Sequence, residues 1–515
     1  MTLPLFIKNF LLCFSSALLL ILAFPQTDFW GLAWIGLIPL FFALDGKSFK
    51  SAFGTAYLCG LMVFAGTLYW FIHVTLLGMI LLILYLALYY GVFGVLYVFF
   101  PRRKFLEQLL LLPSYWIVLE FVRAHALSGF GWVSLGYSQY KNLPLIQVAD
   151  ITGVYGISFL IVLVNIFLKK WLAEQCSGKK FFKDREGRCA AVLVGGALIV
   201  VLFYGIFRLN QPPDQKQKLK IAVIQGNIPQ AMKWNETLWP EIMEKHLQLT
   251  EAAALLKPDL ILWPETAFPE ILGETPERFT ELKKRVARLK IPLLVGAVTQ
   301  DVSDTGPAYY NSAILISPAG ETVGQYDKLH LVPFGEYVPL RGYLPILTDI
   351  VPIDDFTAGK TYTVFPASGV RPWKKGEHNF SVLICFEDAV TDIAREFAVQ
   401  GAGFFVNITN DAWFMDTKAP FMHLQSSVFR AVETRRPIVR AANTGVSCFV
   451  DRQGHIHDCV QDSEGKKTFV SGYHVGTMTP ESGGLRTVYT NFGDFFTYLC
   501  FGCILWGIIR KKGRS

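Results

Sequence analysis

The stretch Phe380-Ser-Val-Leu-Ile-Cys-Phe-Glu-Asp388 begins as a short apolar run and ends with a thiol and two carboxylates. Short apolar runs bounded by polar residues are typical of buried strands in α/β sheets. A helical pattern follows from Val390 to Val399, so Cys385 is expected at the turn between a strand and a helix. A helix N-terminus could stabilise a thiolate there, although most free cysteines are buried structural residues.

The polar segment around this stretch alternates between strand and helix patterns. Strands are expected at residues 219–224, 259–263, 292–296, 312–316, 322–326, 380–385 and 403–407. Helices are expected at residues 236–256, 276–289 and 390–399. Alternation of this kind predicts an α/β domain in which helices cover the faces of sheets.

The rest of the chain has the composition of a membrane protein. Of its 515 residues, 52% are hydrophobic and only 17% are charged, which is outside the range of soluble domains. Eight apolar stretches are long enough to span a bilayer, at residues 9–25, 28–44, 53–73, 76–100, 106–122, 152–168, 189–207 and 491–509. The first lacks a small-residue cleavage site, so we expect it to stay as an anchor.

Basic residues indicate the orientation of these spans. They cluster after spans two, four, six and eight, at residues 47–50, 102–104, 169–188 and 510–514. If every span alternates, all four clusters lie on one side, which the positive-inside rule identifies as the cytoplasm. Both termini are then cytoplasmic, and the segment between spans seven and eight is periplasmic.

Three parts are therefore predicted along the chain. They are a seven-span bundle at residues 1–207, an external α/β domain at 208–490, and an eighth span with a basic tail at 491–515. The net charge of +7 does not indicate nucleic-acid binding, because the basic residues lie beside apolar segments and form no recognisable reading helix.

Two cysteines besides Cys385 fall in the external segment, Cys448 and Cys459. If Gln453 and Gly454 form a two-residue hairpin turn, these two cysteines lie opposite each other across two strands. An oxidising compartment would permit a disulfide between them. Strand pairs can also carry two free thiols, so both states stay open.

Two further motifs place chemically useful side chains at strand ends. Leu262-Trp-Pro-Glu265 ends one predicted strand, and its proline restricts the backbone before the glutamate. Tyr326-Asp-Lys328 ends another predicted strand. Each residue has an ordinary alternative, since a glutamate there can cap a helix or turn and a lysine after a strand is most often solvated.

Glu265, Lys328 and Cys385 together form a chemically complete set. A thiol that attacks a carbonyl needs a base for its proton and a cation or donor for the oxyanion. Glu265 can act as the base, Lys328 as the oxyanion stabiliser and Cys385 as the nucleophile. No metal site is expected, because ligand-like spacing with cysteine is missing for His330, His423, His455 and His457.

The three motifs resemble the Glu-Lys-Cys triad of the nitrilase superfamily. Nearly the full length, spans included, is similar to its membrane-embedded branch, the apolipoprotein N-acyltransferases. The longer matching strings are Val-Ile-Gln-Gly-Asn-Ile-Pro-Gln at 223–230, His-Leu-Val-Pro-Phe-Gly-Glu-Tyr-Val-Pro at 330–339 and Asn-Asp-Ala-Trp-Phe at 410–414. The resemblance implies a four-layer αββα sandwich inserted between spans seven and eight of an eight-helix transmembrane bundle.

The resemblance also assigns further site residues. Glu336 and Glu387 match acidic residues that support the triad. Substrate-binding positions are matched by Trp234, Phe334, Phe386, Asn410 and Trp413. For the two tryptophans, ordinary packing is the alternative. Phe386 stands where the family commonly has tyrosine, so a role for that hydroxyl is in doubt, whereas an apolar wall for an acyl chain remains.

The implied reaction is a ping-pong acyl transfer. The acyl chain moves from the sn-1 ester of a phospholipid, by resemblance phosphatidylethanolamine, to Cys385 as a thioester. It then moves to the α-amino group of the N-terminal diacylglyceryl-cysteine of a lipoprotein. No cofactor, metal or nucleic acid is implied. The enzyme is expected to be a monomer in the bacterial inner membrane.

Three other functions use the same features differently. A membrane-tethered amidase or nitrilase would hydrolyse a small amide with the same triad, but would not need eight spans. A transporter would carry intramembrane ionisable residues along a path, and few are present, with Glu120 and Arg123 near a span end. A lipoprotein-binding module without catalysis would tolerate loss of the thiol.

Overall fold

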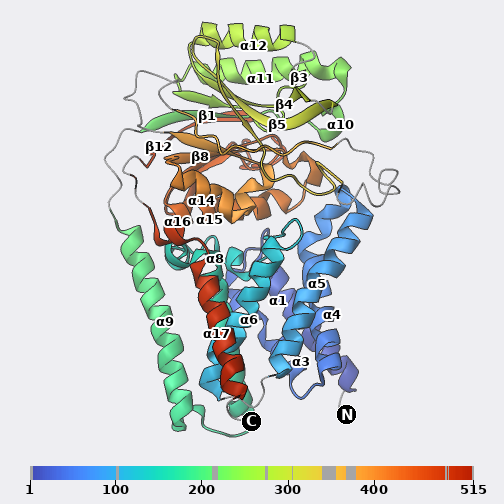
Figure 1. Ribbon diagram of the computed structural model, residues 1–515, viewed down its shortest axis with the longest axis vertical. Helices are drawn as coiled ribbons and strands as arrows, with labels where there is room; N and C mark the ends of the chain where they lie inside the picture. Colours follow the sequence, from blue (N-terminus) through green and yellow to red (C-terminus); the bar gives the residue numbers. More distant parts are fainter. Residues whose placement is uncertain are drawn as a thin grey trace. The chain divides into compact units, whose positions relative to one another are not determined.

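The computed structural model describes residues 4–99, 104–211, 218–272, 276–303, 306–338, 355–366, 379–481, 484 and 486–512. The chain forms two compact units (Figure 1). One comprises Met1–Gln211 with Phe492–Ser515 and is called the helical unit; the other is Pro212–Asn491 and is called the α/β unit. Outside the described residues lie Pro339, the last residue of the string at 330–339, and the basic residues Arg102, Arg103 and Arg514.

The helical unit is built from apolar helices. Its longer helices are α1 (Leu5–Ala23), α4 (Phe49–Leu68), α5 (Leu76–Phe99), α6 (Phe105–His125), α8 (Ala149–Cys176), α9 (Arg185–Leu209) and α17 (Phe495–Lys512). Short elements join them, namely η1 (Trp30–Leu32), α2 (Ala33–Gly36), α3 (Ile38–Leu44), η2 (Tyr69–His73), η3 (Leu135–Gln139), α7 (Leu143–Ile146) and η4 (Phe181–Lys183).

Within the described part of the chain, six helices are long and apolar enough to cross a membrane. They cover Phe6–Ala23, Phe49–His73, Leu76–Phe99, Phe105–His125, Ala149–Cys176 and Arg185–Leu209. Two shorter apolar helical segments, Trp30–Leu44 and Phe495–Arg510, lie where the second and eighth spans are predicted. The second is interrupted between α2 and α3, where Pro39 occupies the first turn of α3 and supplies no backbone N–H.

Ion pairs link helix ends that are far apart in sequence. In one group, Asp45 after span two pairs with Lys169 after span six at 2.7 Å, and Glu107 at the start of span five pairs with Arg510 after span eight at 3.3 Å. The other group joins the opposite ends: Asp28–Lys141 at 2.7 Å and Asp150–Arg208 at 2.7 Å. The first group lies at span ends that alternation assigns to one side, and the second at ends assigned to the other.

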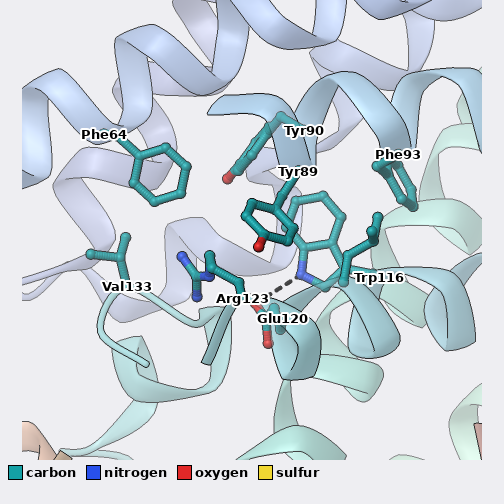
Figure 2. A pocket seen from close by; sticks show the side chains of 9 residues that line it. Phe64, Tyr89, Tyr90, Phe93, Trp116, Glu120, Arg123 and Val133 are labelled. Carbon is teal, nitrogen blue, oxygen red and sulfur yellow. Dashed lines mark hydrogen bonds between the residues drawn. The ribbon is translucent and has the colours of Figure 1, made fainter. Parts of the chain in front are cut away.

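Two buried charged residues, Glu120 and Arg123, lie near the end of α6 beside a pocket (Figure 2). Glu120 Oε1 accepts hydrogen bonds from Trp116 Nε1 at 2.8 Å and from the Leu135 backbone N–H at 2.9 Å. Arg123 Nη2 donates to Ser134 Oγ at 2.8 Å. Other walls of the pocket are aromatic, from Phe64, Tyr89, Tyr90 and Phe93. Because buried charge is tolerated only when it is bonded, these contacts tie the segment after α6 to that helix.

The α/β unit contains two sheets. The seven-stranded sheet has the order β12-β1-β2-β4-β5-β6, with β3 also paired to β4. Its strands are β1 (Leu219–Gln225), β2 (Leu260–Leu262), β3 (Ile271–Leu272), β4 (Leu293–Ser303), β5 (Gly306–Ile316), β6 (Thr322–Asp327) and β12 (Gly472–Met478). The five-stranded sheet has the order β11-β10-β9-β8-β7, with strands β7 (Phe380–Ile384), β8 (Phe404–Thr409), β9 (Ile438–Ala442), β10 (Cys448–Val450) and β11 (Ile456–His457).

Helices cover the outer face of each sheet, as the alternating pattern predicts (Figure 1). Over the seven-stranded sheet lie α11 (Trp239–Ala254) and α12 (Pro276–Leu289), and over the five-stranded sheet lie α14 (Thr391–Val399) and α15 (Ala419–Thr434). Shorter elements are α10 (Gln230–Lys233), η5 (Glu236–Leu238), η7 (Cys385–Ala389), η8 (Asp411–Phe414) and α16 (Val488–Phe492). β1 and β5 also contact β9 and β7, so the two sheets face each other.

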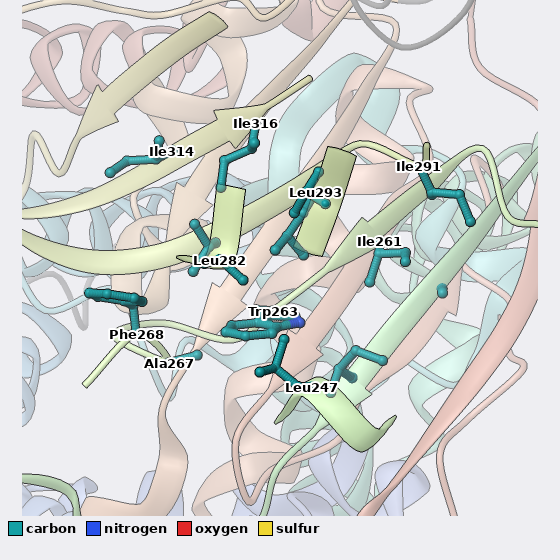
Figure 3. Packing of buried hydrophobic residues seen from close by; sticks show 14 of the residues in the cluster. Leu247, Ile261, Trp263, Ala267, Phe268, Leu282, Ile291, Leu293, Ile314 and Ile316 are labelled. Atoms are coloured by element: carbon teal, nitrogen blue, oxygen red, sulfur yellow. The ribbon is translucent and has the colours of Figure 1, made fainter. Parts of the chain in front are cut away.

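The helix layer over the seven-stranded sheet is held by an apolar core (Figure 3). Trp263 is fully buried beneath α11, and its Nε1 donates to Thr250 Oγ1 at 2.8 Å. On α12, the spacing of Phe279, Leu282 and Val286 places three apolar side chains on one face against this core. Each fully buried side chain of this kind contributes about 1.5–3 kcal/mol to folding.

Element boundaries differ from the predicted ones where polar residues enter an element. The predicted strands 292–296 and 312–316 are the apolar parts of β4 and β5, which pair along their whole lengths as an antiparallel ladder. Backbone pairing continues through polar residues that carry no apolar signal. The predicted helix 236–256 begins as α11 only at Trp239, because Pro240 occupies its first turn and η5 precedes it.

The predicted two-residue hairpin turn at Gln453 and Gly454 is wrong in register. The observed pair Val450–Ile456 encloses a longer turn, so the ladder is shifted by one residue. Asp458 then adopts a left-handed backbone with φ 50°, and the Val460 N–H donates to the Ser447 carbonyl at 3.0 Å. This irregularity returns Cys459 to the place beside Cys448, and both are free thiols.

Candidate active site

Glu265 lies at the point where the chain leaves the seven-stranded sheet after β2. The backbone turns sharply there, with Thr266 at φ 45°. Gly296 of β4 packs against this turn so closely that a Cβ would lie 2.4 Å from the Pro264 carbonyl oxygen. Only glycine fits such an approach. The Glu265 side chain is buried, and its Oε1 accepts a hydrogen bond from Asn311 Nδ2 at 2.7 Å.

Lys328 follows β6 and has only 1% of its side chain exposed. Its Nζ lies 2.7 Å from Glu336 Oε1 and 3.7 Å from Glu265 Oε1. Burial alone would lower the pKa of Lys328, but the charges of Glu336 and Glu265 outweigh it and raise the pKa. Lys328 therefore stays an ammonium ion.

Asn311 of β5 joins the two carboxylates. Its side-chain Nδ2 donates to Glu336 Oε1 at 2.8 Å as well as to Glu265. Its backbone carbonyl oxygen accepts from the Lys328 backbone N–H at 2.9 Å. Asn311 is buried in the middle of this polar cluster, and it is the member that the sequence did not predict. Its signal was weak, because Asn311 lies in a strand whose polar half was not recognised.

Cys385 directly follows β7 and has a left-handed backbone, φ 54°. It is the first residue of the 3₁₀ turn η7, and α14 begins only at Thr391. The expectation that a helix N-terminus stabilises the thiolate is wrong. Burial raises the pKa of the Cys385 thiol well above its usual value, the charge of Glu265 raises it further, and Lys328 only partly opposes them. The resting group is a thiol, which needs a base to become a nucleophile.

Glu387 connects the ends of β6 and β7. Its Oε1 accepts hydrogen bonds from the Tyr326 hydroxyl at 2.8 Å and the Leu329 N–H at 2.7 Å, while Oε2 accepts from the Ile384 N–H at 2.7 Å. Burial raises the pKa of Glu387 to about 7, although these hydrogen bonds and Lys328 oppose the shift. The side chain thus fixes the Cys385 turn relative to the segment that carries Lys328.

Lys233 is a second buried cation at the site, and sequence reasoning missed it. It ends α10, has 4% of its surface exposed, and donates from Nζ to the Glu265 carbonyl oxygen at 2.9 Å. Burial lowers the pKa of Lys233 to about 8, while the charges of Glu265 and Cys385 oppose this shift. A lysine in a polar stretch of sequence is ordinarily solvated, so only the fold reveals the burial of Lys233.

The predicted substrate-binding residues have different surroundings. Trp234 and Trp413 are 49% and 40% exposed, so neither is a core residue. Phe334 and Phe386 are half-buried. Asn410 is buried and already engaged, since Nδ2 donates to Gln230 Oε1 at 2.8 Å and Oδ1 accepts from Asn443 Nδ2 at 2.9 Å. These bonds give Asn410 a structural task, and its role toward substrate stays a prediction, as do those of the others.

Comparison with known proteins covers both units. The family model of the apolipoprotein N-acyltransferase N-terminal domain matches residues 16–167, and the carbon-nitrogen hydrolase model matches residues 220–471. The second match agrees with the two facing sheets and their helices, which form a nitrilase-like fold.

Two relatives that align with most of this chain are both described as apolipoprotein N-acyltransferases. The apolipoprotein N-acyltransferase of Geobacter metallireducens is 36% identical over 96% of this chain and 93% of its own. That of Allorhizobium ampelinum is 32% identical over 87% of each chain. A solved nitrilase-superfamily protein, Saccharomyces cerevisiae Nit3, covers 52% of this chain and 92% of its own at 17% identity, with a TM-score of 0.38, too low to bear on the fold. The chain belongs to the apolipoprotein N-acyltransferase family.

Proposed function

We propose that this chain transfers an acyl chain from a phospholipid to the N-terminus of a diacylated apolipoprotein through a thioester on Cys385. The observation that carries the mechanism is a half-buried thiol that lies close enough to both Glu265 and Lys328 for their charges to act on it. Asn311 and Glu336 hold that carboxylate and that ammonium ion 3.7 Å apart. Such a pair provides a base and a cation within one water-poor site.

In the first step, Glu265 takes the proton of the Cys385 thiol, and the thiolate attacks the sn-1 ester carbonyl of the phospholipid, phosphatidylethanolamine. Lys328 stabilises the negative charge that develops on the carbonyl oxygen. The carbon–oxygen ester bond breaks, and Glu265 returns the proton to the leaving lysophospholipid. Cys385 then carries the acyl chain as a thioester.

In the second step, the α-amino group of the N-terminal diacylglyceryl-cysteine attacks the thioester carbonyl. Glu265 accepts a proton from the attacking amine while Lys328 again stabilises the oxyanion. The carbon–sulfur bond breaks, the amide forms, and the proton returns to Cys385. Water must be kept from the thioester, because hydrolysis would release free fatty acid.

The membrane arrangement belongs to the same proposal. Eight spans carry the chain, with a periplasmic α/β domain at 208–490 between spans seven and eight and both ends on the cytoplasmic side. The six long apolar helices and two shorter ones support this count. The ion pairs Asp45–Lys169 and Asp28–Lys141 support the alternation, because each joins span ends assigned to the same side. The enzyme is proposed to act as a monomer, without metal or cofactor.

Phosphatidylethanolamine with a labelled sn-1 acyl chain tests the thioester. Wild type should form a protein adduct that neutral hydroxylamine removes, whereas Cys385→Ala should form none and Glu265→Gln should form it at least about 10³-fold more slowly. Equal labelling of wild type and Cys385→Ala would end the thioester mechanism.

Adding a diacylated lipopeptide with a free α-amino group tests the transfer. The label should leave the protein and appear in an amide of the peptide. Release of labelled fatty acid without transfer would favour the membrane-tethered hydrolase instead. An N-acetylated lipopeptide is the matched control, since its blocked amine cannot attack.

A further inference from the structure

A buried group of four charged residues lies behind the Cys385 turn. Asp388 comes from η7, Asp411 from η8, His423 from α15 and Arg440 from β9, and each is at most 1% exposed. Burying charge is costly unless partners compensate it. Two carboxylates and two cations balance each other here, and none of the four belongs to the proposed Glu-Lys-Cys set.

His423 contacts the nucleophile residue directly through the backbone. Its Nε2 lies 3.0 Å from the Cys385 carbonyl oxygen and 3.0 Å from Asp388 Oδ1, and its Nδ1 lies 3.0 Å from Asp411 Oδ1. Both ring nitrogens therefore face oxygen acceptors, which a histidine satisfies only when both carry protons. Burial would lower the pKa of His423 and Arg440 opposes its charge, but Asp388 and Asp411 raise the pKa to about 9.

Arg440 fixes the carboxylates that hold this imidazolium. Its Nη1 lies 2.8 Å from Asp388 Oδ2 and donates to Ser427 Oγ at 2.7 Å, and its Nη2 lies 3.9 Å from Asp411 Oδ2. Ser427 Oγ also donates to Asp388 Oδ2. The other oxygen of Asp388 is thereby directed toward His423.

The Cys385 backbone requires such support. A left-handed conformation costs a residue with a side chain roughly 1–3 kcal/mol, and Cys385 adopts φ 54°. Its carbonyl oxygen accepts hydrogen bonds from both His423 Nε2 and Asn407 Nδ2, the latter at 3.1 Å. Rotation of this peptide would change the direction in which the thiol points.

We propose that His423, held as an imidazolium by Asp388 and Asp411, is a positioning residue that directs the Cys385 thiol by gripping its carbonyl oxygen. It acts through the backbone of Cys385 and needs no contact with the substrate. This inference rests on the proposed function only in taking Cys385 as the nucleophile.

His423→Ala and His423→Gln form the test pair. Glutamine places a neutral N–H donor near the Nε2 position, so it restores the bond to Cys385 that alanine removes. In single-turnover acylation, His423→Ala should lower the rate constant about 10- to 100-fold, because small misplacements of a nucleophile cost that much. The phospholipid KM should change less than about threefold, and His423→Gln should recover at least half of the lost rate on a logarithmic scale.

A reagent reaction separates this inference from the proposed function. Alkylation of Cys385 by iodoacetamide, followed by mass spectrometry of its peptide, reports the placement of the thiol without any lipid. The alkylation rate should rank the proteins in the same order as the acylation rate, with wild type fastest, His423→Gln intermediate and His423→Ala slowest. If wild type forms no thioester, the proposed function fails, while the alkylation series still decides the role of His423.

His246→Gln is the matched control, since His246 is equally buried but lies on α11 and contacts the Ile242 carbonyl oxygen at 2.8 Å. It should lower Tm yet keep acylation and alkylation within about threefold of wild type. Asp411→Asn adds a pH profile. Without the Asp411 charge, the pKa of His423 falls, so the imidazolium loses its proton at a lower pH than in wild type. As pH is raised toward 9, acylation should therefore decline in Asp411→Asn at a pH where wild type keeps its rate.

Two outcomes overturn the inference. One is a folded His423→Ala variant, or His423→Gln if alanine does not fold, that lowers Tm but keeps wild-type acylation and alkylation rates. The other is an equal loss in folded His423→Ala and His423→Gln together with a wild-type pH profile for Asp411→Asn.

Discussion

The seven-stranded sheet supplies Glu265, Asn311 and Lys328, whereas the five-stranded sheet supplies Cys385 and Asn407. On the first sheet, Lys328 pairs directly with Glu336, and the Asn311 amide donates hydrogen bonds to both Glu336 and Glu265. On the second, Asn407 donates to the backbone carbonyl of Cys385, the proposed nucleophile, and His423 of the covering helix α15 contacts the same oxygen. Groups that exchange protons need fixed neighbours, while a nucleophile needs a fixed backbone and a free side chain.

Replacing the cation of the first sheet should have the largest effect. Lys328→Met removes the positive charge between Glu265 and Glu336 and the proposed oxyanion partner. We expect formation of the hydroxylamine-sensitive adduct to slow about 10³-fold, in the range found for lost oxyanion donors. Iodoacetamide alkylation of Cys385 should fall much less, because the second sheet is unaltered.

Lys290→Met, at an exposed position after α12, is the control for removing a lysine. Its rate should match wild type. An adduct rate in Lys328→Met within tenfold of wild type would show that the first sheet does not provide the cation of the reaction.

A pair of asparagine variants should sharpen the contrast between the sheets. Asn311→Ala loses two hydrogen bonds to carboxylates, each worth about 1.5–3 kcal/mol, and should slow acylation about 100-fold with little change in alkylation. Asn407→Ala loses the bond to the Cys385 carbonyl and should slow acylation and alkylation by similar factors. If both variants gave the same ratio of the two losses, the division of tasks between the sheets would be wrong.

Glu387 bridges the two sheets, and its effect should be the smallest. Burial raises its folded-state pKa from 4.5 to about 7, so between these values the folded protein binds more protons than the unfolded chain. Its contribution to stability is therefore present at low pH and is lost as pH rises through 7. The Tm of wild type minus that of Glu387→Gln should shrink by a few degrees from pH 5 to pH 7, for a change of about 2 kcal/mol. A difference that grew with pH would contradict this sign.

Local patterns predicted much of the fold. Apolar runs located β1, β2, β7 and β8, and the amphipathic spacing of residues 276–289 predicted α12 with its observed bounds. These elements carry their signal in neighbouring residues, because burial of one face imposes a period of two or of 3.6. The polar halves of β4 and β5 carry no such signal and were missed.

The sequence by itself determined which chemistry is available, because Glu265, Lys328 and Cys385 each follow a strand and strand ends converge at sheet edges. It also determined the membrane character, because apolar length alone sets whether a helix can span a bilayer. Only the tertiary structure decided what surrounds those groups. Lys233, Asn311 and His423 are distant in sequence from the residues they contact, and burial combined with those contacts determines the direction of each pKa shift. For that reason the pKa of the Cys385 thiol, which a helix N-terminus was expected to lower, is instead raised by burial and by Glu265.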